Sequence, residues 1–368
     1  MAAMDIIFTG DLVLDEPRPD YWLGGIALGT LSADVTIGHL EVPHTRRGTE
    51  LRSDVPAPGA DPAHLAALKR AGFDVVTLAG NHIADCGAEG IADTRTELAH
   101  LGIGCCGADS TLGGARRPAL LRFADRRIAV LSYNCVGPES GWASANAAGC
   151  AYVRINTADG KPVSPTAQLQ AADDKSLAAM QSDIAAAATE NDFVIVALHK
   201  GLVHTPARLA PYERPVAHAA IEAGAHTVIG HHAHLIRGME FYLGKPIFHG
   251  LGNGCVVTRA LNQAQDHPAR ATWAIKRKQL FGFEPDPAYW LAPFHPEAIH
   301  AMLGRLCLHA DGRIEAGFLP VYVEAPGRPV IAGGAKAEAI TTYMGRITEA
   351  AGLPALTFTK RDDMVVAA

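Results

Sequence analysis

The stretch TVIGHHAH, residues 227–234, joins an apolar run directly to three imidazoles. The apolar part predicts a buried strand, and the histidines follow where that strand ends. His232 and His234 stand two residues apart, so at an extended strand end or in a tight loop their side chains point the same way. Imidazole is the commonest metal-binding side chain, so the stretch predicts a metal site, although such a pair also occurs as ordinary hydrogen-bonded polar groups.

The same order of apolar run and ligand-type residue recurs four more times. The runs and the residues that follow them are 5–9 with Asp11, 33–37 with Glu41, 74–78 with Asn81 and His82, and 193–198 with His199 and Lys200. Continuous apolar runs with helical patterns between them predict a sheet that is buried on both faces. Binding sites in such sheets lie in the crevice outside the carboxyl ends of the strands, so we expect the polar residues to gather there.

Each of these residues also has an ordinary structural interpretation. Asp11 and Asn81 are typical turn or N-cap residues. Glu41 fits a solvated loop, and His199 fits a hydrogen-bonded strand end. Together, however, carboxylate, amide and imidazole groups form a mixed ligand set that suits a divalent cation.

With these motifs in view, the sequence resembles the CapA-type branch, named for poly-gamma-glutamate capsule synthesis, of the calcineurin-like metallo-dependent phosphatases. The matching elements, in order from about residue 5 to about residue 255, are G-D at 10–11, G-x-L-E at 38–41, A-G-F-D-V-V-x-L-A-x-N-H at 71–82, L-H-x-G at 198–201, G-A-x-x-V-I-G-H-H-x-H at 224–234 and G-K-P-I-F-x-x-L-G-N at 244–253.

The resemblance implies an α/β fold, a calcineurin-like four-layer αββα sandwich with its metal centre at the strand ends. The ligands that it implies are Asp11, Glu41, Asn81, His199, His232 and His234. It also implies that His82 acts as an acid or base beside them. We expect residues 1–260 to form this domain and residues 301–368 to complete it.

The chain departs from the wider phosphatase pattern in one respect. That family begins its site with D-x-H, whereas Asp11 is followed here by Leu12 and Val13, and Glu41 stands where the family uses a bridging aspartate. We therefore expect one or two divalent ions, Mn, Fe, Zn, Mg or Ca, with one position weakened. Phosphoryl transfer usually relies on two cations close together. A site in which one of the two metal positions is weakened therefore disfavours an ordinary phosphatase.

The sequence also offers side chains that could act as acid and base in catalysis. Asp85 follows His82 at a spacing that lets a carboxylate reach an imidazole on a first helical turn. The equal alternative is that Asp85 caps the helix predicted over 89–101. His295 is a second candidate, because a CapA-like relative that epimerises the C-terminal residue of a lasso-peptide precursor uses an acid and a base on opposite faces, and this chain resembles it.

Residues 261–300 are rich in aromatic and cationic side chains and have little periodicity, which predicts a lid or substrate loop. The alternative is a surface loop packed by its own aromatic rings. The substrate-binding candidates are Lys200, Trp273, Lys276, Arg277 and Trp290.

The C-terminal part predicts structure and no chemistry. Strand-like pieces at 305–308 and 317–323 flank an Asp-Gly turn signal, and we expect their hairpin to extend the second sheet of the sandwich. A helix is predicted over 335–351, as one is over 173–191, while 137–170 has no period and predicts a surface excursion.

Bulk properties narrow the setting. The formal net charge of −6 offers no basic field for nucleic acid. No apolar run approaches the length of about 18 residues that a membrane span needs, and the first residues lack a signal-peptide pattern. Seven cysteines without C-x-x-C spacing fit reduced thiols, so we expect a cytoplasmic protein of unknown oligomeric state.

Three functions remain open from the sequence. In the first, an enzyme hydrolyses an amide or ester of a peptide or glutamyl-type substrate, with His82 or His295 protonating the leaving group. In the second, these two histidines exchange a Cα proton in a peptide epimerase. In the third, the site serves binding alone in a non-catalytic factor for polyglutamate assembly.

Overall fold

The computed structural model describes residues 3–50, 57–164, 167–261, 268–361 and 364–368. Two large sheets dominate it. The first sheet has the order β19-β20-β17-β16-β1-β2-β3-β4, with β15 paired to β1 and β18 to β17. Its strands are β1 (Met4–Leu14), β2 (Val35–Leu40), β3 (Val75–Thr77), β4 (Gly104–Cys106), β15 (Asn253–Val257), β16 (His300–Leu308), β17 (Ile314–Glu324), β18 (Arg328–Ile331), β19 (Phe358–Arg361) and β20 (Met364–Ala367).

The second sheet has the order β13-β14-β12-β11-β7-β6. Its strands are β6 (Ala119–Phe123), β7 (Arg126–Asn134), β11 (Phe193–His199), β12 (Thr227–His231), β13 (Met239–Tyr242) and β14 (Lys245–Phe248). Two small ribbons pair β5 (Ala108–Asp109) with β8 (Gly149–Cys150) and β9 (Ile155–Thr157) with β10 (Leu169–Ala172).

The helices, apart from short 3-10 turns, are α1 (Pro19–Leu23), α2 (Ala27–Leu31), α3 (Ala66–Arg70), α4 (Gly87–His100), α5 (Leu112–Ala115), α6 (Asp174–Glu190), α7 (Glu213–Glu222), α8 (Pro268–Phe281) and α9 (Gly334–Ala350). In the described part of the chain, no helix combines the length and the apolar character that crossing a bilayer requires.

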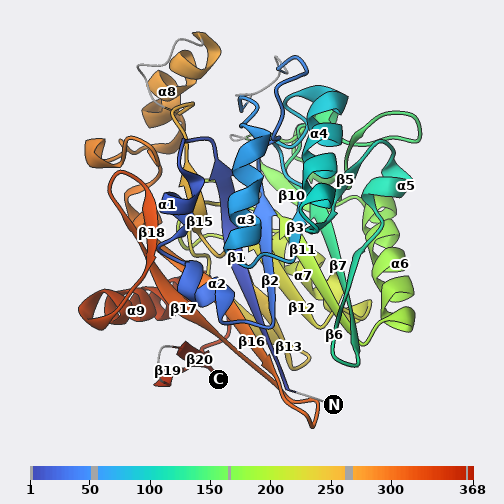
Figure 1. Cartoon of the computed structure of the whole chain (residues 1–368), viewed down its shortest axis with the longest axis vertical. Helices are drawn as coiled ribbons and strands as arrows, with labels where there is room; N and C mark the ends of the chain where they lie inside the picture. The colour runs from blue at the N-terminus through green and yellow to red at the C-terminus, as the bar shows by residue number, and fades with distance from the viewer. Residues whose placement is uncertain (1–2, 51–56, 165–166, 262–267, 362–363) are drawn as a thin grey trace.

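Side-chain alternation along the strands explains the layers. In β1, Ile6 and Phe8 face the second sheet and share one core with its strands β7, β11 and β12. Ile7 faces the other way and packs with α1, α3 and α4. The outer face of the second sheet packs against α6 and α7. Helices thus cover the outer faces of both sheets, and in Figure 1 α3 and α4 lie in front of the strands while α6 lies at the right edge.

Several predicted elements are confirmed. The helix expected over 173–191 is α6, and Asp173 caps it by accepting a hydrogen bond from the Ser176 N–H at 2.9 Å. The helix expected over 335–351 is α9. The region 137–170 contains short strands, β8 and β9, as well as irregular backbone.

The C-terminal hairpin forms, but not where the sequence placed it. β16 and β17 pair antiparallel as predicted. However, β16 then pairs antiparallel with β1, so the hairpin extends the first sheet and not the second. Its apolar residues Met302 and Leu306 join the core between the sheets. The prediction was wrong because alternation alone does not say which sheet edge a hairpin joins.

The segment 261–300 is also more regular than predicted. It contains the 14-residue helix α8, in addition to two short 3-10 turns. Alanine, lysine and arginine favour a helix locally even where the apolar stripe is narrow. Only Ala274 and the two arginines Arg270 and Arg277 are buried among its described side chains, which explains the weak periodicity.

A buried ionic cluster lies next to the end of β11 and the start of α7. The Lys200 ammonium donates to the Glu213 carboxylate at 2.9 Å, and both side chains are fully buried. Arg237 pairs with the same carboxylate at 3.2 Å, and its second Nη donates to the Leu202 carbonyl at 3.0 Å. Lys200 was expected to bind substrate. This placement corrects that expectation, because its amino group is enclosed and already paired.

Replacing Glu213 by Gln should leave Lys200 and Arg237 buried without a counter-charge. We expect the free energy of unfolding to fall by about 3–5 kcal/mol, as when one partner of a buried pair is removed. Urea unfolding of the wild type and Glu213→Gln measures this. Glu222→Gln, at the exposed end of the same helix, should change stability far less, and equal effects would contradict the account.

The same pair predicts a pH dependence. Burial raises the pKa of Glu213, but the charges of Lys200 and Arg237 outweigh this and lower it from 4.5 to about 2. The stabilisation is therefore complete above about pH 4.5 and is lost as the pH falls toward 2. The stability gap between the wild type and Glu213→Gln should narrow over that range. If the difference in unfolding free energy stays constant from pH 7 to pH 3, it does not come from the ionised Glu213 carboxylate.

Candidate metal centre

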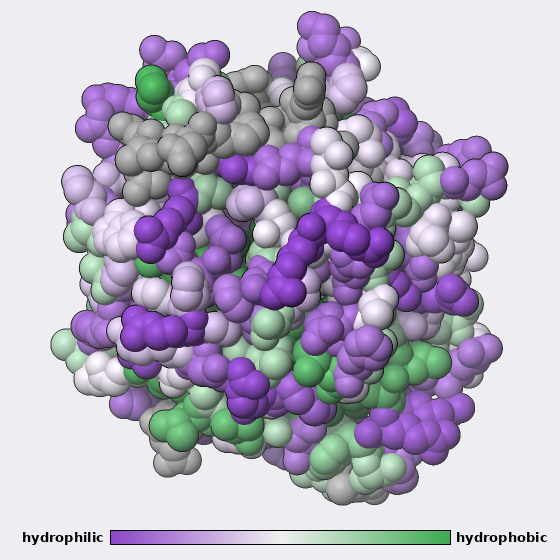
Figure 2. Space-filling view, turned by 45° about the horizontal axis from the view of Figure 1, so that its top comes forward, coloured by the Kyte–Doolittle hydropathy of each residue, from purple (hydrophilic) through white to green (hydrophobic). Residues whose placement is uncertain are grey.

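Parallel strands bring the polar strand ends together. β1, β2 and β3 run parallel in the first sheet, as do β7, β11 and β12 in the second. Their carboxyl ends lie at the end of the molecule away from both termini, on the same side as α8 (Figure 1). In Figure 2 this end is turned toward the viewer, and the visible surface is mostly hydrophilic, with hydrophobic groups in separate patches.

A shift in strand register aims Asp11 between the sheets. Phe8 pairs with Ile37 and Asp11 with His39, so β1 has one residue more than β2 between these two pairs. Such irregularities re-aim side chains, and here Asp11 turns to the inner side that Phe8 faces. The backbone of Gly10 passes so close to Gly252 that an added Cβ would lie 1.9 Å from its carbonyl oxygen. Only glycine fits this approach.

The first group of candidate ligands consists of Asp11, Glu41 and His234. One ligand atom of each lies within 4.8 Å of the others. His234 Nδ1 is 3.5 Å from Asp11 Oδ2, and its Nε2 is 3.6 Å from Glu41 Oε1. The Asn253 side-chain oxygen lies 2.9 Å from the same Nδ1 and orients the ring.

The second group shares Asp11 and adds imidazoles. Asp11, His39 and His199 again offer atoms within 4.8 Å of one another. His199 Nε2 lies 2.7 Å from Asn81 Oδ1 and 3.2 Å from His232 Nδ1. The six ligands implied by the resemblance therefore converge, and Asp11 stands where the two groups meet.

His39 was not singled out from the sequence. It stands two residues before Glu41 and, at the end of β2, faces the same side of the sheet. Its Nδ1 lies 2.9 Å from the Thr77 hydroxyl, which leaves Nε2 toward the cluster. The signal available in the sequence was the spacing of two residues between His39 and Glu41. The chain lacks the histidine of the D-x-H motif, and His39 supplies an imidazole to the same cluster.

Several ligand-type atoms in this region are buried without a hydrogen-bond partner among the described residues. They are His39 Nε2, His199 Nδ1 and Glu41 Oε2. Buried polar atoms are normally paired, so orphaned atoms in one cluster fit a cation that would satisfy the cluster when bound.

Burial also sets the charges of the centre. It lowers the pKa of His39 and His199 well below the usual range, and the neighbouring imidazoles lower it further. These rings are therefore neutral and able to bind a metal at neutral pH. Burial, followed by repulsion from Glu41, raises the pKa of Asp11 well above its usual range. A cation would remove this penalty.

The loop after β12 is conformationally strained. His232 has φ +88° and His234 has φ +55°, in the left-handed region that residues other than glycine rarely adopt. Such strain costs about 1–3 kcal/mol per residue and gathers at functional sites. Of the two conformations considered for this stretch, the structure shows the tight loop and not the extended strand end. His232 and His234 were expected to point the same way, but the loop directs His232 to one group and His234 to the other.

His82 and Asp85 form a hydrogen-bonded pair. His82 Nδ1 lies 2.7 Å from Asp85 Oδ2, and Asp85 also accepts from the Ala57 N–H at 2.6 Å. The N-cap residue of α4 is Cys86. Of the two interpretations of Asp85, the structure shows the pairing with His82 and not the cap.

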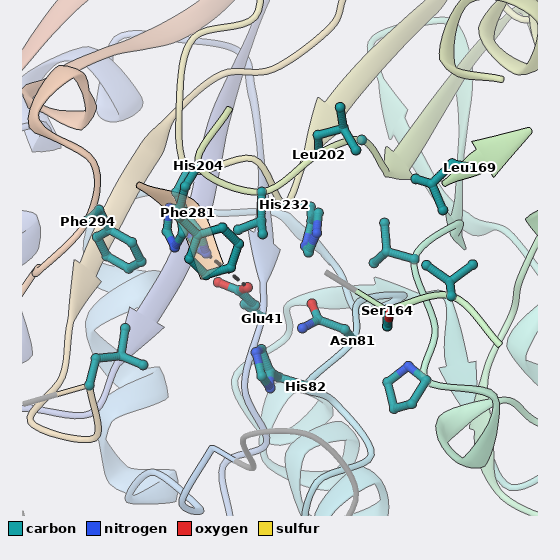
Figure 3. A pocket seen from close by; sticks show the side chains of 17 residues that line it. Glu41, Asn81, His82, Ser164, Leu169, Leu202, His204, His232, Phe281 and Phe294 are labelled. Atoms are coloured by element: carbon teal, nitrogen blue, oxygen red, sulfur yellow. Dashed lines mark ion pairs between the residues drawn. The ribbon is translucent and has the colours of Figure 1, made fainter. Parts of the chain in front are cut away.

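A cavity of about 310 Å³ opens over the cluster. In Figure 3, Glu41 and His232 lie near its centre, and His82 and Asn81 lie below them. The described residues that line it are Glu41, Asn81, His82, Val136, Pro138, Val163, Ser164, Leu169, Gly201, Leu202, Val203, His204, His232, His234, Leu261, Phe281 and Phe294.

The other candidates from the sequence lie elsewhere. His295 lines a neighbouring cavity of about 300 Å³, and its Nδ1 accepts from the Glu297 N–H at 3.1 Å. The guanidinium of Arg277 is buried and donates to the Pro293 carbonyl, so it does not face the cavity. Trp290 is 41% exposed beside Arg259, and Lys276 is exposed on α8. The side chain of Trp273 is outside the described part.

One known protein family matches most of the chain. The family described as "Bacterial capsule synthesis protein PGA_cap" matches residues 5–256, which include every candidate ligand. The chain belongs to this family.

Curated relatives in the PGA_cap family carry names from polymer synthesis. A "Probable polyglutamine synthesis accessory protein" of Mycobacterium tuberculosis is 33% identical over 239 residues, covering 63% of this chain and 59% of that protein. The "PGA biosynthesis protein CapA" of Bacillus subtilis is 28% identical over 187 residues, 50% of this chain and 43% of that protein. The chain thus spans less than two thirds of the length of these relatives.

Two solved structures show a distant likeness. One is a hypothetical protein from Thermus thermophilus, with a TM-score of 0.43 and 16% identity, covering 86% of this chain and 99% of that chain. The other is a putative 5'-nucleotidase from Staphylococcus aureus, with a TM-score of 0.43 and 11% identity, covering 95% of this chain and 58% of that chain.

We expect His39 to contribute to metal binding in this PGA_cap protein. Replacing His39 by Ala should weaken the affinity for a divalent ion by at least roughly 10- to 100-fold, the range for residues that support metal sites. Elemental analysis after equilibrium dialysis gives the metal content. His44→Ala, also a buried histidine near the end of β2 but outside both groups, should keep it. Full metal content in His39→Ala would refute the assignment.

Proposed function

We propose that this PGA_cap protein is a metal-dependent enzyme on a calcineurin-like αββα sandwich, and that it hydrolyses an amide or ester bond in a peptide or glutamyl-type substrate. The observation that carries the proposal is the position of the His82–Asp85 pair, which places an oriented imidazole in the same cavity as the two ligand groups. Such a pair beside a Lewis acid is what amide hydrolysis requires.

The residues present fit one or two divalent ions. One position would be held by Asp11, Glu41 and His234, and the other by Asp11, His39, His199, Asn81 and His232. A cation bound there would polarise the substrate carbonyl and lower the pKa of a water molecule. The mixture of carboxylates and imidazoles suits Mn, Fe or Zn, and also Mg or Ca.

The protein's own groups handle the leaving group. The Asp85 carboxylate fixes the His82 ring through Nδ1, which leaves Nε2 as the atom that can exchange a proton. In the proposed reaction His82 gives this proton to the nitrogen or oxygen of the bond that breaks. A water molecule supplies a hydroxyl group to the acyl carbon, and its other proton replaces the one that His82 gives up. The products are a carboxylic acid, which then ionises, and a free amine or alcohol.

Relatives and cavity together suggest the substrate class. The names of the relatives refer to the synthesis of polyglutamine and of PGA. The described lining of the cavity contains no lysine or arginine that would receive free carboxylates. We therefore favour an amide within a peptide-type chain over a short, highly charged glutamate oligomer.

Epimerisation is the second candidate, and one observation favours it. The cavity that His295 lines also touches Phe294 and Asn253. Phe294 borders the main cavity, and Asn253 orients His234. His82 and His295 thus line different cavities that share Phe294, and exchange of a Cα proton would need the two histidines on opposite faces of the Cα.

Replacing His82 by Ala should lower kcat by about 10²- to 10⁴-fold, the usual contribution of general acid–base catalysis, with metal content unchanged. Asp85→Asn should lower it less. Candidate peptides, α- and γ-linked, are incubated with the metal-loaded protein and analysed by mass spectrometry. Full activity in His82→Ala would reject the role of His82 that the proposal depends on. If the wild type converts none of the peptides, the non-catalytic assembly role suggested by the relatives' names remains.

Deuterated water separates the two reactions. Hydrolysis predicts a new carboxylate, no deuterium at Cα and full activity in His295→Ala. Epimerisation predicts deuterium at Cα without cleavage, and loss of exchange in both His82→Ala and His295→Ala.

A further inference from the structure

One more imidazole lines the main cavity, and it has no part in either ligand group. His204 follows β11 in the loop that leads to α7, and it is only 4% exposed. Its backbone N–H donates to the Ala233 carbonyl at 3.1 Å. Since Ala233 stands between His232 and His234, His204 is held against the loop that carries two candidate ligands.

Aromatic rings enclose His204. Its ring centroid lies 5.0 Å from that of Phe281, 5.3 Å from Phe283 and 5.6 Å from Phe294, and the His234 ring is 5.8 Å away. The backbone of His204 has φ +52°, again in the left-handed region. Packing that holds a histidine in a disfavoured conformation indicates that the orientation of this ring matters.

The hydrogen-bonding capacity of this imidazole is not used by the described part of the protein. Its Nδ1 is buried without a hydrogen-bond partner among these residues. A neutral imidazole offers one donor and one acceptor, and a buried group left unpaired is destabilising. The wall of a substrate cavity is a place where a ligand can supply the missing partner.

We propose that His204 is a substrate-binding residue whose imidazole hydrogen-bonds to a backbone amide of the peptide-type substrate. The inference rests on the proposed function for the class of substrate, but it does not depend on whether the bond is hydrolysed or the Cα is epimerised. Figure 3 shows His204 and His82 on opposite sides of Glu41, so a peptide that reaches His82 and lies over the centre can also meet His204. The surrounding phenylalanines exclude water from this contact and strengthen it.

The test measures binding separately from turnover. The parent protein is metal-loaded His82→Ala, which binds the probe without consuming it. The favoured probe is N-acetyl-alanyl-alanine amide, which carries no carboxylate. N-acetylated, C-amidated diglutamates, one α-linked and one γ-linked, represent the less favoured charged class. Calorimetry gives the Kd for each probe. His204→Phe fills the aromatic surroundings and removes the hydrogen bond, whereas His204→Gln keeps an amide that can donate.

We expect His204→Phe to bind the preferred probe about tenfold more weakly, as the loss of one hydrogen bond allows. His204→Gln should recover part of that loss. The control is His226→Gln, which removes a largely buried histidine packed against Phe193 at the other end of β11, and its Kd should match the parent's. Metal content and melting temperature should stay at the parent values in His204→Phe.

The outcomes decide between the two proposals. Equal Kd values for His204→Phe and the parent overturn the inference, and so does failure of every probe to bind the parent. Loss of metal from His204→Phe shows a structural role and also overturns it. If His204→Phe weakens binding while the protein with His82 intact converts no peptide, the proposed function fails and the role of His204 stands.

Discussion

The electrostatics of the candidate site depend on two carboxylates that are buried side by side. Asp11 is 1% exposed and Glu41 is 2% exposed, and their mutual repulsion adds to the effect of burial on Asp11. Like charges enclosed away from water are strongly unfavourable unless a cation or a proton neutralises them. Imidazoles surround them, and burial lowers the pKa of His39 and His199, so these two rings can bind a cation without adding charge. The site is therefore arranged for a positive ion that the side chains alone do not provide.

The sandwich architecture makes this arrangement possible. Asp11, His39, Glu41 and Asn81 come from the first sheet and the loops after its strands, whereas His199, His232 and His234 come from the second. One apolar core packs the inner faces of both sheets against each other. The ligands can meet only because this core holds the strand ends together, so fold stability and site geometry depend on the same contacts. The buried ionic cluster of Lys200, Glu213 and Arg237 also holds the loop after β11 in place, because Arg237 donates to the carbonyl of Leu202, which lines the cavity.

Much of the site could be predicted from the sequence because strand ends converge in buried sheets. His199 and His232 needed only the identification of apolar runs and of the residues after them. Asp11 lies inside β1, and its inward direction depends on a register shift that the sequence did not indicate. Lys200 was misjudged because it follows His199 directly, and side chains of neighbouring residues in extended backbone point to opposite faces. The sequence could not place His295, because it caps a short turn in a neighbouring cavity, which no periodicity indicates.

His39 and His204 were missed for different reasons. His39 follows the predicted apolar run 33–37 and lies inside the observed strand β2, and only the facing second sheet makes its inner face a candidate metal site. His204 lies in a loop whose path is set by a hydrogen bond to Ala233 and by rings from α8, residues far from it in the sequence. The hairpin of β16 and β17 was placed in the wrong sheet because local pattern does not specify a sheet edge. In each case the position depends on packing between parts of the chain that are far apart in the sequence.

The central claim is that residues from both sheets surround a divalent cation. Anomalous diffraction from crystals grown with Mn²⁺ tests it most directly. The account predicts a strong peak between Asp11, Glu41 and His234, with a second position, if occupied, next to His39 and His199. A manganese-saturated crystal with no peak within ligand distance of Asp11, or with its peak elsewhere on the protein, would contradict it.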